Sequence, residues 1–311
     1  MSASARDALT RHLPRPAFLA GLRRAPEWVV IWVPLLLSAG HVVLFAAWTT
    51  WLSFTPSTLL PVDGWVGLRN YTTVLATRNW KIAFDNLLLF GSGFVVLTML
   101  VGLVLAILLD QRIRGENVLR SIFLYPLAVS FVVTGTVWSW LLNPGMGVQK
   151  LVNDWGWTSF RFDWLVDRDM AIWTIVIAGI WQASGFAMAL FLAGLRSVEP
   201  DLNKAAQIDG AGPIRMYVRV ILPTLWPIAI AVLVILLQMA ITTFDLVRAL
   251  TGGGPGIATQ LPALVVYDFM FQRGHLGRGA AAAVLMLLTL LIVLLPYGVW
   301  KYVQRRRAAR A

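Results

Sequence analysis

Residues 199–223 read EPDLNKAAQIDGAGPIRMYVRVILP, a polar stretch set between two strongly apolar runs. Pro200 suits the first turn of a helix, where its missing N–H is not needed. Gly210 can adopt the positive φ that ends a helix, and the pair Gly212-Pro213 starts the chain again. The stretch therefore predicts a helix–turn–helix that lies outside the bilayer.

The first predicted helix of this stretch, residues 200–210, has one face of small residues. The positions i, i+3, i+4 and i+7 on that face are Leu202, Ala205, Ala206 and Asp209. Alanine side chains project little beyond the backbone, so another protein could approach this face closely. The face is the first candidate interaction site.

Composition indicates the class of the protein. Hydrophobic residues make up 58% of the 311 residues and charged residues 13%, and the mean hydropathy is +0.72. These values exclude an ordinary soluble domain and indicate a polytopic membrane protein. The chain has no cysteine, so a disulfide and a thiolate metal site are excluded. The net charge of +11 is carried by residues that flank the apolar runs, which favours membrane topology over nucleic-acid binding.

Six apolar runs are long enough to cross a bilayer, for which about 20 residues suffice. They predict an all-α integral membrane protein with six transmembrane helices and both termini on one side. The transmembrane domain is predicted at residues 28–302, between an N-terminal tail at 1–27 and a basic C-terminal tail at 303–311. The first run is too long for the apolar core of a signal peptide. The six predicted spans are 28–53, 86–109, 121–142, 171–194, 220–244 and 279–300.

Basic residues indicate the orientation. Of the 26 Lys and Arg residues, 17 fall in the N-terminal tail, in the loops 111–120 and 195–219, and in the C-terminus from Lys301 onward. Cytoplasmic segments carry an excess of these residues, so both termini and the 195–219 loop are predicted to be cytoplasmic. The loops 54–81 and 143–170 then lie outside. Their Trp and Tyr residues are typical of interface anchors, or of a surface that receives an extracytoplasmic binding protein.

The 199–223 stretch resembles the EAA loop of bacterial ABC importer permeases, which have the MetI-like fold. The resemblance rests on Lys204-Ala-Ala, Gly210 and Val220-x-Leu222-Pro223. Lys204 stands where the family usually has Glu, which reverses a charge, and Val220 where it usually has Ile. The resemblance implies a cytoplasmic coupling helix, between spans 4 and 5, that docks on an ATPase subunit. An ordinary amphipathic loop is the alternative. The expected coupling residues are Lys204, Ala205, Ala206, Asp209 and Gly210.

A second informative stretch, residues 243–286, begins TFDLVRALTGGGPG. The run from Gly252 to Gly256 contains a proline and cannot continue a helix. It lacks the Lys-Ser/Thr of a nucleotide P-loop, so we expect no ATP binding by this chain. The stretch resembles the FD…LTGGGP…T segment of carbohydrate-type, MalF-like ABC permeases, and the longer run resembles the glucose/mannose and α-glucoside members most.

Polar residues inside the predicted spans are mostly neutral, and such residues are candidates for a substrate path. Amides and aromatic rings suit a neutral polyhydroxyl solute, whereas an anionic solute would call for a buried Arg or Lys. The alternative is that the amides hydrogen-bond between helices. The candidate path residues are Gln182, Gln238, Phe244 and Asp245.

The sequence offers no catalytic or metal-binding cluster. His41 and His275 lack a second His, Cys or carboxylate at ligand spacing, so both are interpreted as structural. No Ser–His–Asp arrangement or carboxylate pair is evident, so an enzyme is not expected. No cofactor is expected in this chain.

The resemblance implies a permease subunit of an ATP-driven importer for a neutral sugar, in the bacterial inner membrane. The implied partners are a second homologous permease, an ATPase dimer that holds ATP and Mg, an extracytoplasmic sugar-binding protein and membrane lipid, with no nucleic acid. A glycerol-phosphate or polyamine permease is the first alternative. An ion-coupled secondary transporter, from another class, would need intramembrane ionisable residues or a repeat.

Overall fold

The computed structural model describes residues 27–308 except 112, 199–201 and 203–211. The residues so described form helices, turns and loops, with no strand among them. Two compact units make up the chain, Met1–Trp51 and Leu52–Ala311, and each is described by itself. The prediction of an all-α chain is confirmed for the described residues.

The described part of the first unit belongs to α3 (Glu27–Ser53), a helix whose last two residues lie in the second unit. Its segment Trp32–Ser53 is long and apolar enough to cross a membrane. This agrees with the first predicted span at 28–53.

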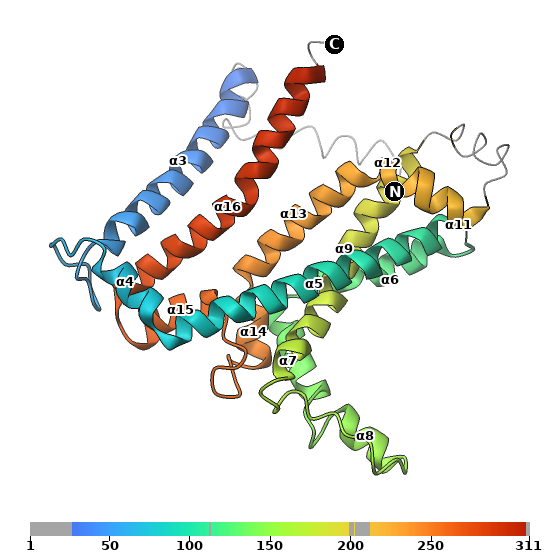
Figure 1. Cartoon of the computed structure of the whole chain (residues 1–311), viewed down its shortest axis with the longest axis horizontal. Coiled ribbons are helices and arrows are strands. Elements are labelled where there is room, and N and C mark those ends of the chain that lie inside the picture. The colour runs from blue at the N-terminus through green and yellow to red at the C-terminus, as the bar shows by residue number, and fades with distance from the viewer. Residues whose placement is uncertain (1–26, 112, 199–201, 203–211, 309–311) are drawn as a thin grey trace, which may run out of the picture. The chain divides into compact units, whose positions relative to one another are not determined.

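Three long helices of the second unit are also candidate spans: α5 (Arg78–Asp110), α9 (Ala171–Ser197) and α16 (Leu276–Ala308) (Figure 1). They correspond to the second, fourth and sixth predicted spans. α5 begins earlier than the predicted start at residue 86, because Thr77 caps the helix by accepting a hydrogen bond from the backbone N–H of Trp80.

The third predicted span, 121–142, is wrong as a continuous helix. α6 (Glu116–Ala128) and α7 (Phe131–Leu141) are bent by 98° at a break between them. Pro126 lies in the last turn of α6, and Val129 is extended. Ser130 then starts α7 by accepting a hydrogen bond from the N–H of Val132 through its side chain.

The fifth predicted span, 220–244, is also not one continuous helix. The chain restarts as α11 (Pro213–Met216) at the predicted Gly212-Pro213 and continues through η1 (Tyr217–Ile221) and α12 (Leu222–Thr224). It then bends by 62° before α13 (Trp226–Thr242). Pro227 lies in the first turn of α13 and has no N–H to continue the preceding ladder. The described helices therefore make four candidate spans, or up to six if each bent pair is one span.

The fifth region is interrupted a second time, at Thr243 and Phe244, before α14 (Asp245–Leu250). α14 ends in the predicted glycine turn, in which Gly252, Gly253 and Gly256 have positive φ. The sharp turn expected from the second sequence motif is confirmed.

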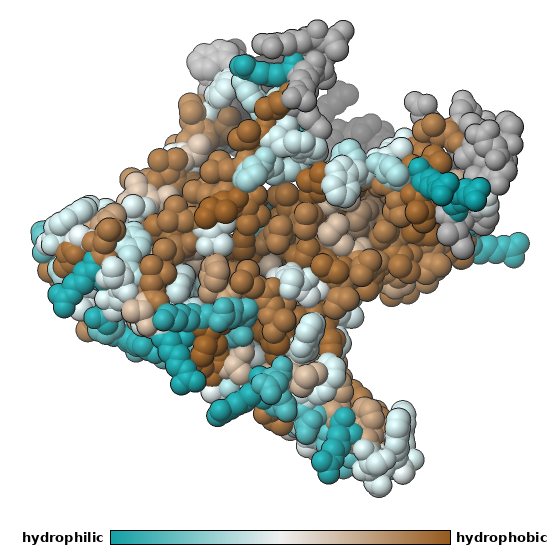
Figure 2. Space-filling view, viewed as in Figure 1, coloured by the Kyte–Doolittle hydropathy of each residue, from teal (hydrophilic) through white to brown (hydrophobic). Residues whose placement is uncertain are grey.

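α9 lies at the centre of the second unit. Of its most apolar window 67% is buried, against 33% for α5 and 28% for α16. Glycines allow close packing here: a Cβ on Gly102 of α5 would lie 2.6 Å from the Cβ of Ala187, and a Cβ on Gly185 would overlap the backbone of Phe123 in α6. Figure 2 shows apolar side chains over α5 and α13 and hydrophilic ones around α8 (Val148–Asp154).

A smaller core lies at the beginning of α16. α4 (Arg69–Ala76), α15 (Pro262–Tyr267) and η2 (Asp268–Gln272) pack against this end of the helix. Its buried members include Val74, Trp80, Val265, Phe269 and Ala281. This core fixes the first turns of α16.

Candidate functional site

The five predicted coupling residues, Lys204, Ala205, Ala206, Asp209 and Gly210, lie outside the described residues. The same holds for the predicted helix at 200–210, apart from Leu202. The chain is described up to Val198, after α9, and again from Gly212, before α11. The residues that flank the predicted coupling segment on its two sides, called its two bases, are therefore among the described residues.

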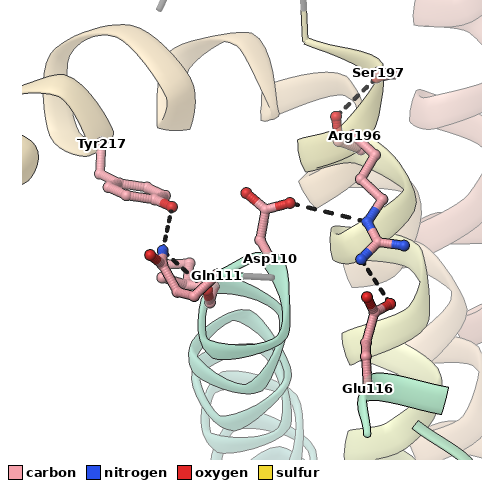
Figure 3. Close-up of polar contacts among 8 residues, drawn as sticks. Asp110, Gln111, Glu116, Arg196, Ser197 and Tyr217 are labelled. Carbon is pink, nitrogen blue, oxygen red and sulfur yellow. Dashed lines mark hydrogen bonds and ion pairs between the residues drawn. The ribbon is translucent and has the colours of Figure 1, made fainter. Parts of the chain in front are cut away.

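Arg196, in the last turn of α9, forms the first base (Figure 3). Its Nη2 lies 2.6 Å from Oε1 of Glu116, and its Nε lies 3.9 Å from Oδ1 of Asp110. Glu116 is in the first turn of α6 and Asp110 is the last residue of α5. A cation at a helix C-terminus and an anion at an N-terminus are each favoured by the helix dipole.

Tyr217, at the start of η1, belongs to the second base. Its hydroxyl accepts a hydrogen bond of 3.0 Å from Nε2 of Gln111, the residue after Asp110 (Figure 3). The Arg196 cluster, defined as Asp110, Gln111, Glu116, Arg196 and Tyr217, thus joins the ends of α5, α6 and α9 to the start of η1. Both bases of the predicted coupling segment thus contact polar side chains between the end of α5 and the start of α6.

Sequence reasoning did not find the Arg196 cluster. It counted the 111–120 and 195–219 loops for their basic residues only. The available signal was the pair of acids, Asp110 and Glu116, on either side of a basic loop, together with Arg196 at the edge of the polar stretch.

Gln182 is buried within α9, with 1% of its surface exposed. Its Nε2 donates a 2.8 Å hydrogen bond to the carbonyl of Val129, at the break between α6 and α7. Its Oε1 is buried without a partner among the described residues. In this structure the amide makes the interhelical contact that the sequence analysis left as an alternative, and a place for Gln182 in a substrate path remains a prediction.

Phe244 and Asp245 line a pocket of about 160 Å³ where α13 gives way to α14. Phe131, the first residue of α7, and Thr242 and Thr243 also line it. The two threonine hydroxyls donate to the carbonyls of residues 238 and 239, and so present lone pairs as acceptors. The pocket therefore combines aromatic faces, hydroxyls and one carboxylate, with no cationic residue among its lining.

The four path residues are thus not all brought together. Phe244 and Asp245 share the pocket, whereas Gln238 is exposed on α13 outside its lining and Gln182 is in the core. The ring of Phe244 lies 5.3 Å from that of Tyr267, over which the guanidinium of Arg248 lies at 5.1 Å. These contacts fix one aromatic wall of the pocket.

Comparison with known proteins identifies relatives over nearly the whole chain. A probable ABC transporter permease from Pyrococcus horikoshii is 36% identical over 90% of this chain and 98% of its own length. A xylose/arabinose import permease from Haloferax volcanii is 33% identical over 91% and 89%. An sn-glycerol-3-phosphate transport permease from Yersinia enterocolitica is 28% identical over 90% and 97%.

The fold is found in a solved structure as well. A chain of a bacterial ABC transporter involved in the import of the polysaccharide alginate matches with a TM-score of 0.73 and 19% identity, over 93% of this chain and 99% of that one. Residues 98–309 match the family described as the inner membrane component of binding-protein-dependent transport systems. Both helix breaks and the Arg196 cluster lie inside this matched region. The chain belongs to the family of inner membrane components of binding-protein-dependent transport systems.

Proposed function

We propose that this chain is the transmembrane permease subunit of an ATP-driven importer for a neutral sugar, either a hexose or an α-glucoside or oligosaccharide. Its family is a transport component rather than a catalyst. The proposed partners are a second, homologous permease, an ATPase dimer that holds ATP and Mg, and an extracytoplasmic sugar-binding protein. The proposed location is the bacterial inner membrane, with both termini in the cytoplasm.

The pocket at the α13–α14 break carries the proposal for a neutral solute. Its lining combines the carboxylate of Asp245, two threonine hydroxyls and the rings of Phe131 and Phe244. A carboxylate and hydroxyl lone pairs accept hydrogen bonds from sugar hydroxyls, and aromatic faces cover the apolar face of a sugar ring. The carboxylate would repel a phosphate. Gln182 and Gln238 are proposed as further path residues that other states of the transporter would bring to the solute.

The coupling step is proposed for the segment between the two bases. Closure of the ATPase subunits would move Lys204, Ala205, Ala206, Asp209 and Gly210. The Arg196 cluster supports this proposal, because it ties both bases to the ends of α5 and α6. A movement of the segment would then reach these helices through short polar contacts and shift the permease between inward-facing and outward-facing states.

The test is ATPase activity of the whole complex in proteoliposomes, with candidate neutral sugars, glycerol phosphate and their binding proteins. We expect stimulation by a neutral sugar. Asp245→Asn should lower sugar uptake about ten-fold, while Asp169→Asn, a matched change at an exposed outer-loop carboxylate, should leave it unchanged. Equal uptake by both variants would remove Asp245 from the path.

Glycerol phosphate is the second candidate, because one relative transports it and is 28% identical. The two candidates make opposite predictions at one residue. If the solute is a phosphate, Asp245→Asn should raise uptake by removing a repelling charge. Stimulation by glycerol phosphate together with that gain would replace the neutral-sugar proposal.

A further inference from the structure

A second pocket, of about 210 Å³, lies between the beginning of α4, the segment after α3 and the beginning of α16. Arg69, His275 and Arg278 line it, with Ser57, Thr58 and Asn70, and no acidic residue is among its lining. Arg69 and Arg278 form no ion pair with any described residue. Two guanidinium groups in one pocket repel each other unless an anion lies between them.

The walls of this pocket are firmly built. The side-chain amide of Asn70 donates to the carbonyls of Ser53 and Thr55, both at 2.9 Å. The N–H groups of Leu276 and Gly277 donate to the carbonyls of Thr58 and Ser57, at 3.3 and 2.9 Å. Gly277 is required because a Cβ there would overlap the carbonyl of Thr55. The backbone beside Arg69 and Arg278 is therefore held by hydrogen bonds that do not depend on a ligand.

The position of the pocket along α16 indicates the source of the anion. The candidate span Leu276–Val303 has 28 residues and is about 42 Å long, more than the ~30 Å hydrocarbon core and close to the ~40–45 Å that includes the headgroups. Arg278 lies in its first turn, where phospholipid headgroups are found. Arg278 has this position in the span in either orientation of the chain.

The loop beside the pocket, residues 59–68, exposes large apolar side chains, with Asp63 as its one charged residue. Leu59, Leu60, Trp65 and Leu68 are 80%, 73%, 70% and 64% exposed. Trp is enriched at membrane interfaces, and the ring of Trp65 is held by stacking 4.8 Å from that of Phe54. Large apolar side chains next to a cationic pocket at a span end fit a lipid, whose phosphate and acyl chains are joined in one molecule.

We propose that the pocket of Arg69, His275 and Arg278 binds the phosphodiester of an anionic phospholipid, with the 59–68 loop against the upper part of its acyl chains. Guanidinium groups bind phosphate through paired N–H donors. The site goes beyond the proposed transport function and requires only that the chain is in a membrane. Its ligand is bound by α4, α16 and the segment after α3 together.

The experiment is native mass spectrometry of the complex, released from bilayers that hold phosphatidylglycerol and phosphatidylcholine in equal amounts. The wild type should retain phosphatidylglycerol several-fold over phosphatidylcholine. Arg69→Gln, an exposed position that should not disturb folding, and Arg69→Gln/Arg278→Gln should lose this preference. The matched control Arg161→Gln/Arg168→Gln, two exposed arginines of the 143–170 loop, should keep it.

Three outcomes would overturn the proposal. One is equal retention of phosphatidylglycerol by the Arg69 variants and the control. Another is full displacement of the lipid by inorganic phosphate, which would make free phosphate the ligand. The third is that the Arg69 variants retain phosphatidylglycerol as the wild type does, yet lose the stimulation of ATPase activity by the binding protein in pure phosphatidylcholine. That result would assign the pocket to a carboxylate of the binding protein. None of these outcomes depends on which solute is transported.

Discussion

At the scale of single residues, the Arg196 cluster is the feature nearest to the proposed coupling step. Arg196, Asp110 and Glu116 are partly exposed, at 43%, 30% and 24% of their side-chain surface. Partly exposed ion pairs contribute about 1 kcal/mol or less to the free energy of unfolding. Such pairs therefore affect the position of the segments that they join more than the stability of the protein.

Arg196→Gln is therefore expected to change the unfolding free energy by about 1 kcal/mol or less, yet to lower substrate-stimulated ATPase activity several-fold. Thermal unfolding and ATPase assays of the same preparation measure the two effects. Lys150→Gln is the matched control, since it breaks a 2.9 Å ion pair with Asp154 in α8, outside the Arg196 cluster. Equal activity of the two variants would exclude a coupling role for Arg196.

For Gln182 we expect a larger effect on stability than for Arg196, because its side chain is buried. Gln182→Leu removes the donor from the carbonyl of Val129, so the unfolding free energy should fall by about 1–2 kcal/mol. Gln238→Leu, at an exposed position of α13, should be nearly neutral for stability. Thermal unfolding in detergent compares them. A stable Gln182→Leu variant with impaired uptake would instead favour a place for Gln182 in the path.

Some site residues could be predicted from the sequence and others could not, for a physical reason. Phe244 and Asp245 lie next to each other in a motif with helix-breaking glycines, so a local pattern marks them. The Arg196–Glu116 pair joins residues 80 positions apart. Only the packing of α9 beside α5 and α6 brings such a pair together, and no local pattern encodes that packing.

At the scale of elements, the apolar runs predicted where α3, α5, α9 and α16 lie, since hydropathy depends on composition summed along the chain. They did not predict the bends of 98° and 62°. Those depend on single residues, such as the capping hydroxyl of Ser130 and the missing N–H of Pro227, which leave the average hydropathy almost unchanged. Apolar runs therefore predict which segments can cross a membrane better than they predict where the helices in those segments bend.

Gly185 tests the contact between two of these elements. In Gly185→Ala the new methyl group would overlap the backbone of Phe123, which cannot rotate away as a side chain could. α6 and α9 would have to separate, at a cost of about 1–3 kcal/mol in unfolding free energy. Gly298→Ala is the matched control in α16, where a Cβ meets nothing within 4 Å. Equal melting temperatures for the two variants would contradict this packing.

At the scale of the whole molecule, the coupling segment should control transport without controlling assembly in the membrane. Ala206→Glu places a charge on the predicted docking face, and Gly210→Pro opposes the predicted helix end. Both should reduce stimulated ATPase activity and uptake at least ten-fold, with normal subunit levels in membranes. Val218→Ala, an exposed position after the segment, serves as control. Normal uptake by both variants would remove the coupling assignment.

The fastening of α16 has a mechanical consequence. Its first residues are bonded to the carbonyls of Ser57 and Thr58, whereas its other end has no comparable attachment among the described residues. A helix of 33 residues is about 50 Å long, so a tilt of about 10° around the fastened end would displace the other end by about 9 Å. A rotation about Gly277 would therefore displace the C-terminal end of α16 far more than its first turns.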